Sequence, residues 1–379
     1  MKVGILTMPP ISNYGGIIQA YALQTVLQRM GHDVMILNRQ YGGYGDSYYQ
    51  KYRTIVVRKL KSLLGKEDEY TKYIKPFEYV TLKPQEFVKK YLRITRPLCL
   101  THELKKEACD NQFEAYVVGS DQVWRPKYVT NIYNYYLDFV KDAKAKKIAY
   151  AVSFGVDTWE YNSLETKRCA FLAKKFKAIS VREDSGRQLC EEYLGVKAQH
   201  VLDPTLLLDK QYYISIIDNE DVYTSEGDMF CYILDNSETK TRYIENISKT
   251  TSMKPYFCRP KFDPSNNNLE QHIEDCVFPS VGQWLKSFFD AKMVIVDSFH
   301  GAVFSIIFNK PFWVIKNKKR GEARFASLLK QFDLSERFIS EDAMPEDFFK
   351  PIDWTRVNAI RKQLQEESLS YLVRNLNSQ

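Results

Sequence analysis

The stretch from Met293 to Ile315, MVIVDSFHGAVFSIIFNKPFWVI, constrains the fold more than any other part of the chain. Met293–Val296 is a short apolar run rich in β-branched residues, which is typical of a strand buried on both faces. Gly301–Asn309 has apolar residues at helical spacing, and Phe312–Ile315 is a second apolar run. The order strand, helix, strand predicts an open α/β sheet with parallel strands.

His300 lies between the first predicted strand and the predicted helix. Asp297 and Ser298 are favourable N-cap residues, so we expect His300 in or near the first helical turn. This position is the carboxyl end of a strand, where open α/β sheets bind ligands. The start of a helix favours anions and a neutral imidazole, and Gly301 lets a ligand approach the backbone. The pattern predicts an acid–base or ligand-contacting histidine; the alternative is a capped core helix against which His300 simply packs.

Length and composition indicate a two-domain, soluble globular protein. The chain has 379 residues, of which 44% are hydrophobic and 27% charged. The net charge of +7 is modest for this length and does not by itself predict nucleic-acid binding. No apolar run approaches the length of a transmembrane helix. The seven cysteines are dispersed and the five histidines lie far apart, which predicts reduced thiols in the cytoplasm and no metal site.

The N-terminal segment has the pattern of a strand–helix–strand unit. Lys2–Thr7 and Val34–Leu37 are the expected strands, and Ile17–Met30 has the pattern of an amphipathic helix. The turn between the first strand and the helix, Asn13–Gly16, contains two glycines but is not the GxGxxG nucleotide fingerprint. A polar or anionic ligand group suits such a helix start, although a simple tight turn has the same pattern.

A second polar loop follows the predicted strand Ala115–Val118. It runs from Gly119 to Pro126 and carries a carboxylate, an indole and a guanidinium. Asp121 could accept a proton or bind a sugar hydroxyl, and Trp124 could stack on a sugar face. The alternative is that Asp121 only caps the following turn.

Repeated strand–turn–helix units predict two doubly wound parallel sheets. We expect a first domain at 1–206, with a helical insertion at about 40–100 that includes helices near Thr54–Leu64 and Pro84–Tyr91. A second domain is expected at 207–350, and a C-terminal helix in 351–379 would pack back across the first domain.

Several of these motifs, taken together and in order, resemble the polysaccharide pyruvyl transferase family. The matching pieces span most of the chain and are Asn13-Tyr14-Gly15-Gly16, Gly119-Ser120-Asp121-Gln122-Val123-Trp124, Ser153-Phe154-Gly155, Ser180-Val181-Arg182-Glu183, Asp203-Pro204-Thr205 and Asp297-Ser298-Phe299-His300-Gly301. The resemblance implies two Rossmann-like halves, as in the GT-B glycosyltransferases, with the site in the cleft between them. It also implies transfer of a pyruvyl group from phosphoenolpyruvate to two hydroxyls of a sugar or lipid-linked oligosaccharide, which gives a cyclic ketal and requires no cofactor.

The resemblance also suggests roles for particular residues. Family members often carry an arginine two residues before the histidine, where this chain has Ser298, so Arg182 and Arg324 are the expected substitutes for holding the donor's charge. We expect His300 to be the acid or phosphate contact and Asp121 to be the base. The expected donor-binding residues are Arg182, Arg324, Ser298, Gly301, Asn13, Gly15 and Gly16. The expected acceptor-binding residues are Ser120, Gln122, Trp124 and Tyr14.

Two other functions fit the same observations. One is a glycosyltransferase with a nucleotide-sugar donor, because the implied fold is shared. The other is a non-catalytic module that binds sugar or a partner, which the missing arginine would favour. For the enzyme functions we expect a small-molecule donor and a glycan acceptor as partners, and no nucleic acid. The sequence is compatible with a peripheral contact between the protein and a membrane.

Overall fold

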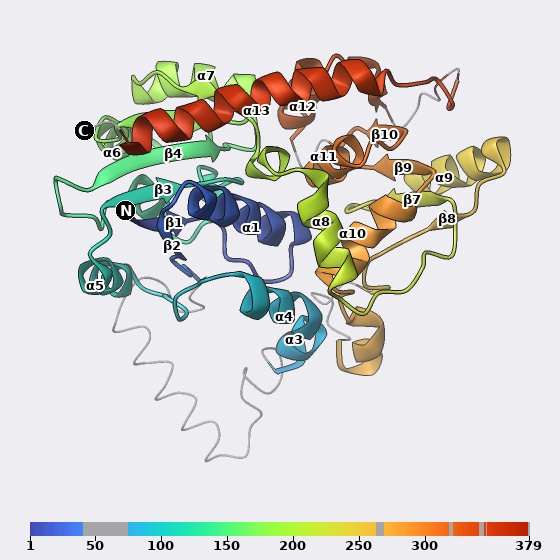
Figure 1. The fold of residues 1–379 in the computed structure, drawn as a ribbon, viewed down its shortest axis with the longest axis horizontal. Coiled ribbons are helices and arrows are strands. Elements are labelled where there is room, and N and C mark those ends of the chain that lie inside the picture. The colour runs from blue at the N-terminus through green and yellow to red at the C-terminus, as the bar shows by residue number, and fades with distance from the viewer. Residues whose placement is uncertain (41–74, 263–268, 318–320, 341–344, 346, 378–379) are drawn as a thin grey trace.

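The computed structural model describes residues 1–40, 75–262, 269–317, 321–340, 345 and 347–377. Two parallel sheets with helices on both faces make up the two halves of the described chain (Figure 1). The structure thus has the two-sheet α/β architecture that the sequence predicts. The helix predicted near Thr54–Leu64 lies outside the described residues.

Within these ranges the first sheet has six strands, all parallel, in the order β2-β1-β3-β4-β5-β6. The strands are β1 (Lys2–Leu6), β2 (Asp33–Ile36), β3 (Ala115–Val118), β4 (Lys146–Val152), β5 (Ala178–Val181) and β6 (Gln199–His200). The helices of this half are α1 (Tyr14–Arg29), α3 (Lys75–Val80), α4 (Leu82–Tyr91), α5 (Thr101–Asn111), α6 (Ser163–Ala173) and α7 (Asp184–Leu189), with short turns η2 (Pro126–Tyr128), η3 (Ile132–Tyr136), η4 (Cys190–Leu194) and η5 (Pro204–Leu207).

The second sheet, in the part of the chain that is described, has five parallel strands in the order β11-β10-β9-β7-β8. They are β7 (Met229–Tyr232), β8 (Pro255–Tyr256), β9 (Met293–Val296), β10 (Phe312–Ile315) and β11 (Phe338–Ile339). The helices here are α8 (Lys210–Asp218), α9 (Glu238–Thr251), α10 (Val281–Asp290), α11 (Phe299–Ile307), α12 (Ala323–Gln331) and α13 (Trp354–Asn377), with turns η6 (Leu269–Cys276) and η8 (Ser335–Arg337).

Each sheet has one point at which the strand order reverses. In the first sheet this point lies between β1 and β3, and in the second it lies between β7 and β9. Open parallel sheets bind ligands beyond the carboxyl ends of the strands at such a point. The loops after β1, β3 and β9, which lead to Asn13, Asp121 and His300, are therefore the expected site.

One apolar cluster joins the two halves. It includes Ile17 and Leu23 of α1, Val294 of β9, Phe304 of α11 and Leu372 of α13. Separate clusters cover the other face of each sheet. Since all four residues of β9 are buried, the strand is covered on both faces, as its β-branched pattern predicts.

Two helices begin earlier than their apolar patterns predict. The α1 helix starts at Tyr14 rather than at Ile17, because Asn13 caps it by accepting from Gly16 N at 3.2 Å. The α11 helix starts at Phe299, with Ser298 as its N-cap. His300 therefore lies in the first turn of a helix, as predicted.

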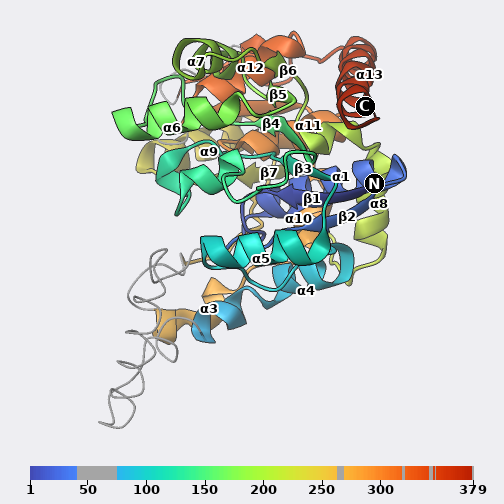
Figure 2. The ribbon, with the colours of Figure 1, turned by 90° about the vertical axis from the view of Figure 1, so that its left-hand side faces the viewer.

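The C-terminal helix α13 lies against the first sheet. Tyr371 Oη donates to Ala149 O of β4 at 3.0 Å, and Ser368 Oγ accepts from Leu202 N at 3.0 Å. Figure 2 shows α13 and α6 on opposite faces of β4. The helix predicted to cross back from the second half thus contacts the first.

Candidate functional site

A buried ionic cluster lies beyond the carboxyl ends of the first sheet's strands, and Arg182 is at its centre. Its Nη2 contacts Asp121 Oδ1 at 2.9 Å, and its Nη1 contacts Asp203 Oδ2 at 2.7 Å. Arg182 and Asp203 are each 2% exposed, so both charges are removed from water. Each charge compensates the other's cost of burial. The loops after β3, β5 and β6 are held together by this cluster.

His300 comes to the same cluster from the second half. Its Nε2 lies 3.8 Å from Asp203 Oδ2, which is beyond hydrogen-bond distance. Within the described residues this buried nitrogen makes no hydrogen bond. The imidazole packs against the start of α1, because a Cβ on Gly15 would lie 2.1 Å from His300 Nδ1. Gly15 is therefore required for the ring to occupy this position.

Arg324, in the first turn of α12, is the second buried cation at the site, with 4% exposure. The guanidinium carbons of Arg324 and Arg182 lie 5.7 Å and 4.5 Å from the ring centroid of Phe299. Phe299 is the residue before His300, so α11 presents an aromatic ring to both cations and an imidazole to the carboxylates. The two arginines predicted to replace the family arginine at Ser298 are thus brought together.

The starts of two helices meet beside these charges. A Cβ on Gly16 would lie 3.6 Å from Asp121 Oδ2, which places the first turn of α1 next to the carboxylate. Ser298 Oγ accepts from Gly301 N at 3.4 Å and caps α11. Helix starts carry partial positive charge and favour an anion.

The two halves also touch at the rim of the site. Gly321 packs so closely on the loop after β4 that a Cβ there would lie 1.9 Å from Gly155 O. Its positive φ of 81° is a second reason for glycine at this position. Asp184 N donates to Ser327 Oγ of α12 at 3.0 Å. These contacts fix α12, and with it Arg324, against the first half.

The ionisation of the cluster follows from burial and mutual charge. Burial alone would raise the pKa of Asp121, but Arg182, His300 and Arg324 outweigh it and lower the pKa. The pKa of Asp203 is lowered in the same way, by His300 and Arg182. Burial lowers the pKa of Arg324, and the charge of Arg182 lowers it further, to about 10. Both carboxylates are therefore ionised at neutral pH, and an anion near Arg324 would be stabilised.

Three of the predicted acceptor-binding residues are buried in the structure. Trp124 is fully buried, stacks on Tyr136 with ring centroids 4.5 Å apart, and donates from Nε1 to Tyr135 O at 3.0 Å. Tyr14 stacks on Trp284 and is 2% exposed. These rings have packed faces, so the prediction that they contact a sugar does not fit this structure.

Ser120 and Gln122 differ in their access to solvent. Ser120 is fully buried and donates to Asp203 Oδ2 at 2.9 Å, so its hydroxyl supports the ionic cluster. Gln122 is partly exposed and its Oε1 accepts from Arg125 Nη1 at 3.3 Å. Of the four predicted acceptor contacts, Gln122 is the one whose side chain reaches the surface.

Two residues of the site were not predicted. Asp203 binds Arg182 and faces His300, and Glu183 accepts from Phe154 N at 2.8 Å and thereby holds the loop after β4. Glu183 is fully buried. Both residues belong to motifs that carry the family resemblance and directly follow predicted strands. Their positions at the carboxyl ends of β5 and β6 are the sequence feature that could have indicated a place in the site.

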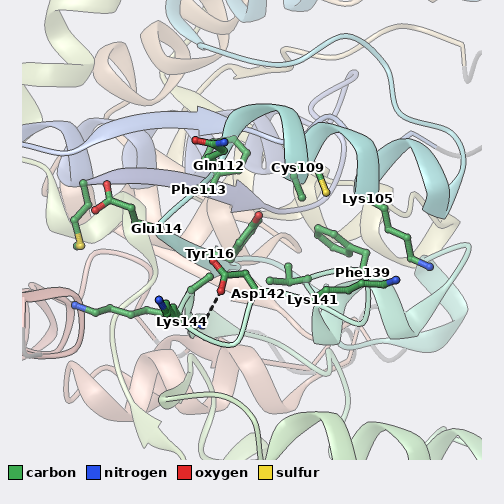
Figure 3. A pocket seen from close by; sticks show the side chains of 15 residues that line it. Lys105, Cys109, Gln112, Phe113, Glu114, Tyr116, Phe139, Lys141, Asp142 and Lys144 are labelled. Atoms are coloured by element: carbon green, nitrogen blue, oxygen red, sulfur yellow. Dashed lines mark hydrogen bonds between the residues drawn. The ribbon is translucent and has the colours of Figure 1, made fainter.

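A separate pocket of about 720 Å³ lies at the opposite edge of the first sheet (Figure 3). It is formed by the starts of β3 and β4 and by α5, and none of the residues of the ionic cluster lines it. In the described ranges no group of three or more His, Cys, Asp or Glu side chains is arranged to hold a metal. No helix among the residues described is both long and apolar enough to span a membrane.

The architecture places the chain in a structural class. The structure of UDP-GlcNAc 2-epimerase from Methanocaldococcus jannaschii is similar, with 12% identity, a TM-score of 0.51 and 99% of each chain covered. Arabidopsis thaliana UGT89C1 complexed with UDP-L-rhamnose is similar with 8% identity, a TM-score of 0.51 and 98% of each chain covered. At these identities the likeness concerns the fold alone. The chain has a GT-B-like fold, with a polar cluster where its two sheets meet.

The sequence then identifies the family. A family model of polysaccharide pyruvyl transferase matches residues 13–319. The chain belongs to the polysaccharide pyruvyl transferase family, and it is an enzyme of that family. Comparison with curated proteins gives no significant match.

Proposed function

We propose that the protein transfers a pyruvyl group from phosphoenolpyruvate to two hydroxyls of a sugar in a cell-surface polysaccharide or its precursor. The observation that carries the proposal is the buried Nε2 of His300, which makes no hydrogen bond within the described chain and lies among buried charges. A buried polar atom of this kind is costly unless a ligand satisfies it. Family membership supports the reaction class.

Arg324 is the cation best suited to hold the donor. Arg182 contacts two carboxylates directly, Asp121 and Asp203, and these contacts fix the position of its guanidinium. Arg324 is buried and close to Arg182, and its lowered pKa reflects unfavourable burial of the charge. A phosphate or carboxylate bound there would relieve this cost, and a guanidinium can bind either group with two parallel hydrogen bonds. Ser298, at the family arginine position, would contribute the capped start of α11 rather than a charge.

Ketal formation needs proton transfers that His300 could serve. A proton is added to the CH₂ carbon of phosphoenolpyruvate and a sugar hydroxyl adds to C2, with loss of its own proton. The C2–O bond to phosphate then breaks, and the second hydroxyl closes the ring and loses its proton. One positioned acid–base group typically contributes about 10²–10⁴-fold to the rate.

Asp121 would act mainly through its charge. The lowered pKa of this carboxylate makes it a weak base at neutral pH. Its contact with Arg182 and its position beside the start of α1 suit it to holding the cluster together. Among the predicted acceptor contacts, the partly exposed Gln122 remains in the proposal.

We also propose a cytoplasmic location and a sugar or lipid-linked oligosaccharide acceptor. Five cysteines within the described residues are free thiols, which supports a reducing compartment; they are Cys109, Cys169, Cys190, Cys231 and Cys258. A lipid-linked acceptor would be reached by a peripheral contact with the membrane.

The test is phosphate release from phosphoenolpyruvate with a panel of candidate glycans, together with thermal stabilisation by phosphoenolpyruvate alone. We expect phosphoenolpyruvate to raise the melting temperature and His300→Asn to reduce phosphate release at least about tenfold. His272→Asn, at an exposed histidine outside the cluster, is the matched control. Stabilisation by UDP- or GDP-sugars with none by phosphoenolpyruvate would favour a glycosyltransferase instead.

A further inference from the structure

A groove of about 800 Å³ lies on the seam between the two halves, outside the ionic cluster. One wall comes from α3 and α4 of the first half, and the other from the end of η6, the start of α10 and the segment after α8. Figure 1 shows α3 and α4 beside this part of the second half, and α3 contacts η6 while α4 contacts α10. The volume falls within the range of roughly 300–1,000 Å³ that is usual for ligand sites.

We propose that this groove binds a neutral oligosaccharide segment of the acceptor, at a distance from the sugar that receives the pyruvyl group. The inference rests on the proposed function, because it takes the acceptor to be a glycan chain. In this proposal the groove recognises the length of the acceptor chain, whereas the compact ionic cluster binds only the reacting groups.

The groove carries the side chains that sugar recognition uses. Tyr223 is 66% exposed and Tyr79 is 41% exposed, so each presents an aromatic face to solvent from one wall. An exposed tyrosine offers an apolar ring face and a polar edge, and this combination suits stacking on a sugar ring. Glu86 and Asp221 are exposed beside them and can accept hydrogen bonds from hydroxyl groups.

Hydrogen bonds hold the two walls of the groove against each other before any ligand binds, through the Tyr79 hydroxyl and through the backbone at Tyr223. Tyr79 Oη donates to Glu274 Oε1 at 2.7 Å, which ties the first wall to the second. Gln283 accepts from Tyr223 N at 2.9 Å and donates to Tyr223 O at 3.1 Å. Lys90 Nζ donates to Asn219 O at 3.1 Å, across the same seam. The backbone of a groove fixed in this way loses little freedom on binding.

The groove differs from the proposed donor site in its charge. Its described lining has four carboxylates and two lysines, so it disfavours an anion such as phosphoenolpyruvate. A neutral sugar, or one that carries an amine, fits this balance better than a uronic acid chain.

The groove and the ionic cluster are linked by direct contacts. Tyr14 Oη donates to Pro279 O of the groove at 2.8 Å, and the Tyr14 ring contacts Phe278 with centroids 6.3 Å apart. The next residue, Gly15, packs against His300. Gln85 of α4 donates to Ile11 O at 2.6 Å and so anchors the loop that leads to α1. An acceptor chain in the groove would therefore lie next to the element that positions His300.

The test uses the full chain on an array of neutral and acidic oligosaccharides of one to eight sugar residues. We expect the wild type to bind neutral chains of three or more residues better than single sugars. Replacing both rings, Tyr79→Ala with Tyr223→Ala, should weaken this binding about tenfold, because two aromatic contacts are lost. The Tyr223→Phe variant keeps the ring and should bind like the wild type, which separates stacking from general damage to the fold.

Two further measurements distinguish this proposal from the proposed function. The double variant should keep its thermal stabilisation by phosphoenolpyruvate, and His300→Asn should keep its binding to the array. If no oligosaccharide binds the wild type, if acidic chains bind best, or if the double variant binds as well as the wild type, the groove is not an acceptor site. Failure of phosphoenolpyruvate to stabilise the protein would contradict the proposed function alone.

Discussion

Gly15→Ala tests whether the position of His300 matters, without changing any polar group. The added methyl would lie 2.1 Å from His300 Nδ1 and 2.5 Å from its Cγ, so the imidazole must move away from α1. His300 is 7% exposed and the site around it is packed, which leaves little room for the ring to turn. Overpacking of this kind costs about 1–3 kcal/mol, and a displacement of about 1 Å at a reacting group can lower activity about 10²-fold.

Gly16→Ala is the matched comparison, since it adds a methyl one residue further along the same helix. The nearest atoms to that methyl, Asn13 Cγ and Asp121 Oδ2, are both 3.6 Å away, which is an ordinary contact. The assay is phosphate release at saturating phosphoenolpyruvate, with melting temperatures measured in parallel. We expect Gly15→Ala to lose at least about ten times more activity than Gly16→Ala. Equal activities in two folded variants would refute the reasoning.

Three further predictions concern the ionic cluster and its neighbours. Arg324→Gln should abolish stabilisation by phosphoenolpyruvate while the protein stays folded, as thermal shift measurements with and without the donor would show; an unchanged shift would contradict the assigned role. Asp203→Asn breaks a buried ion pair and should lower the free energy of unfolding by about 3–5 kcal/mol in urea titration. The pKa of Asp203 is lower in the folded protein than in the unfolded chain, where it is near 4. Ionised Asp203 therefore stabilises the fold fully above about pH 4, and this stabilisation is lost as the pH falls further. The free energy of unfolding of Asp203→Asn should accordingly change less with acidic pH than that of the wild type. Trp124→Phe should lower the melting temperature and leave the KM for acceptor unchanged, because the indole is buried; a raised KM at equal stability would restore the predicted sugar contact.

The strands were predictable because their signal is local. Met293–Val296 and Ala115–Val118 are apolar runs that only a doubly covered sheet accommodates, and the structure has strands at both positions. The start of α1 lies before the predicted Ile17, because Asn13 caps a glycine-containing turn that carries no apolar pattern of its own. The Ser298 cap of α11, in contrast, follows from the residue type before the helix. Capping is a polar effect that hydrophobic periodicity does not record.

The site was predictable only to the level of which strand ends meet. Loops after parallel strands share an edge, so the approach of His300, Asp121 and Arg182 follows from topology. The role of Asp203 depends on its side chain, after β6, contacting Arg182 at the end of the neighbouring strand β5, and sequence spacing does not encode this distance. The burial of Trp124 could not be predicted, because an aromatic residue in a polar loop has the same pattern whether it faces solvent or the core.

We expect a small anionic donor to bind between Arg324 and the imidazole of His300. The most direct measurement is a crystal structure of the protein with phosphoenolpyruvate. We expect the donor within hydrogen-bond distance of the Arg324 guanidinium and His300 Nε2, beside the starts of α1 and α11. Phosphoenolpyruvate bound elsewhere, with His300 Nε2 turned into packed apolar surroundings, would contradict it.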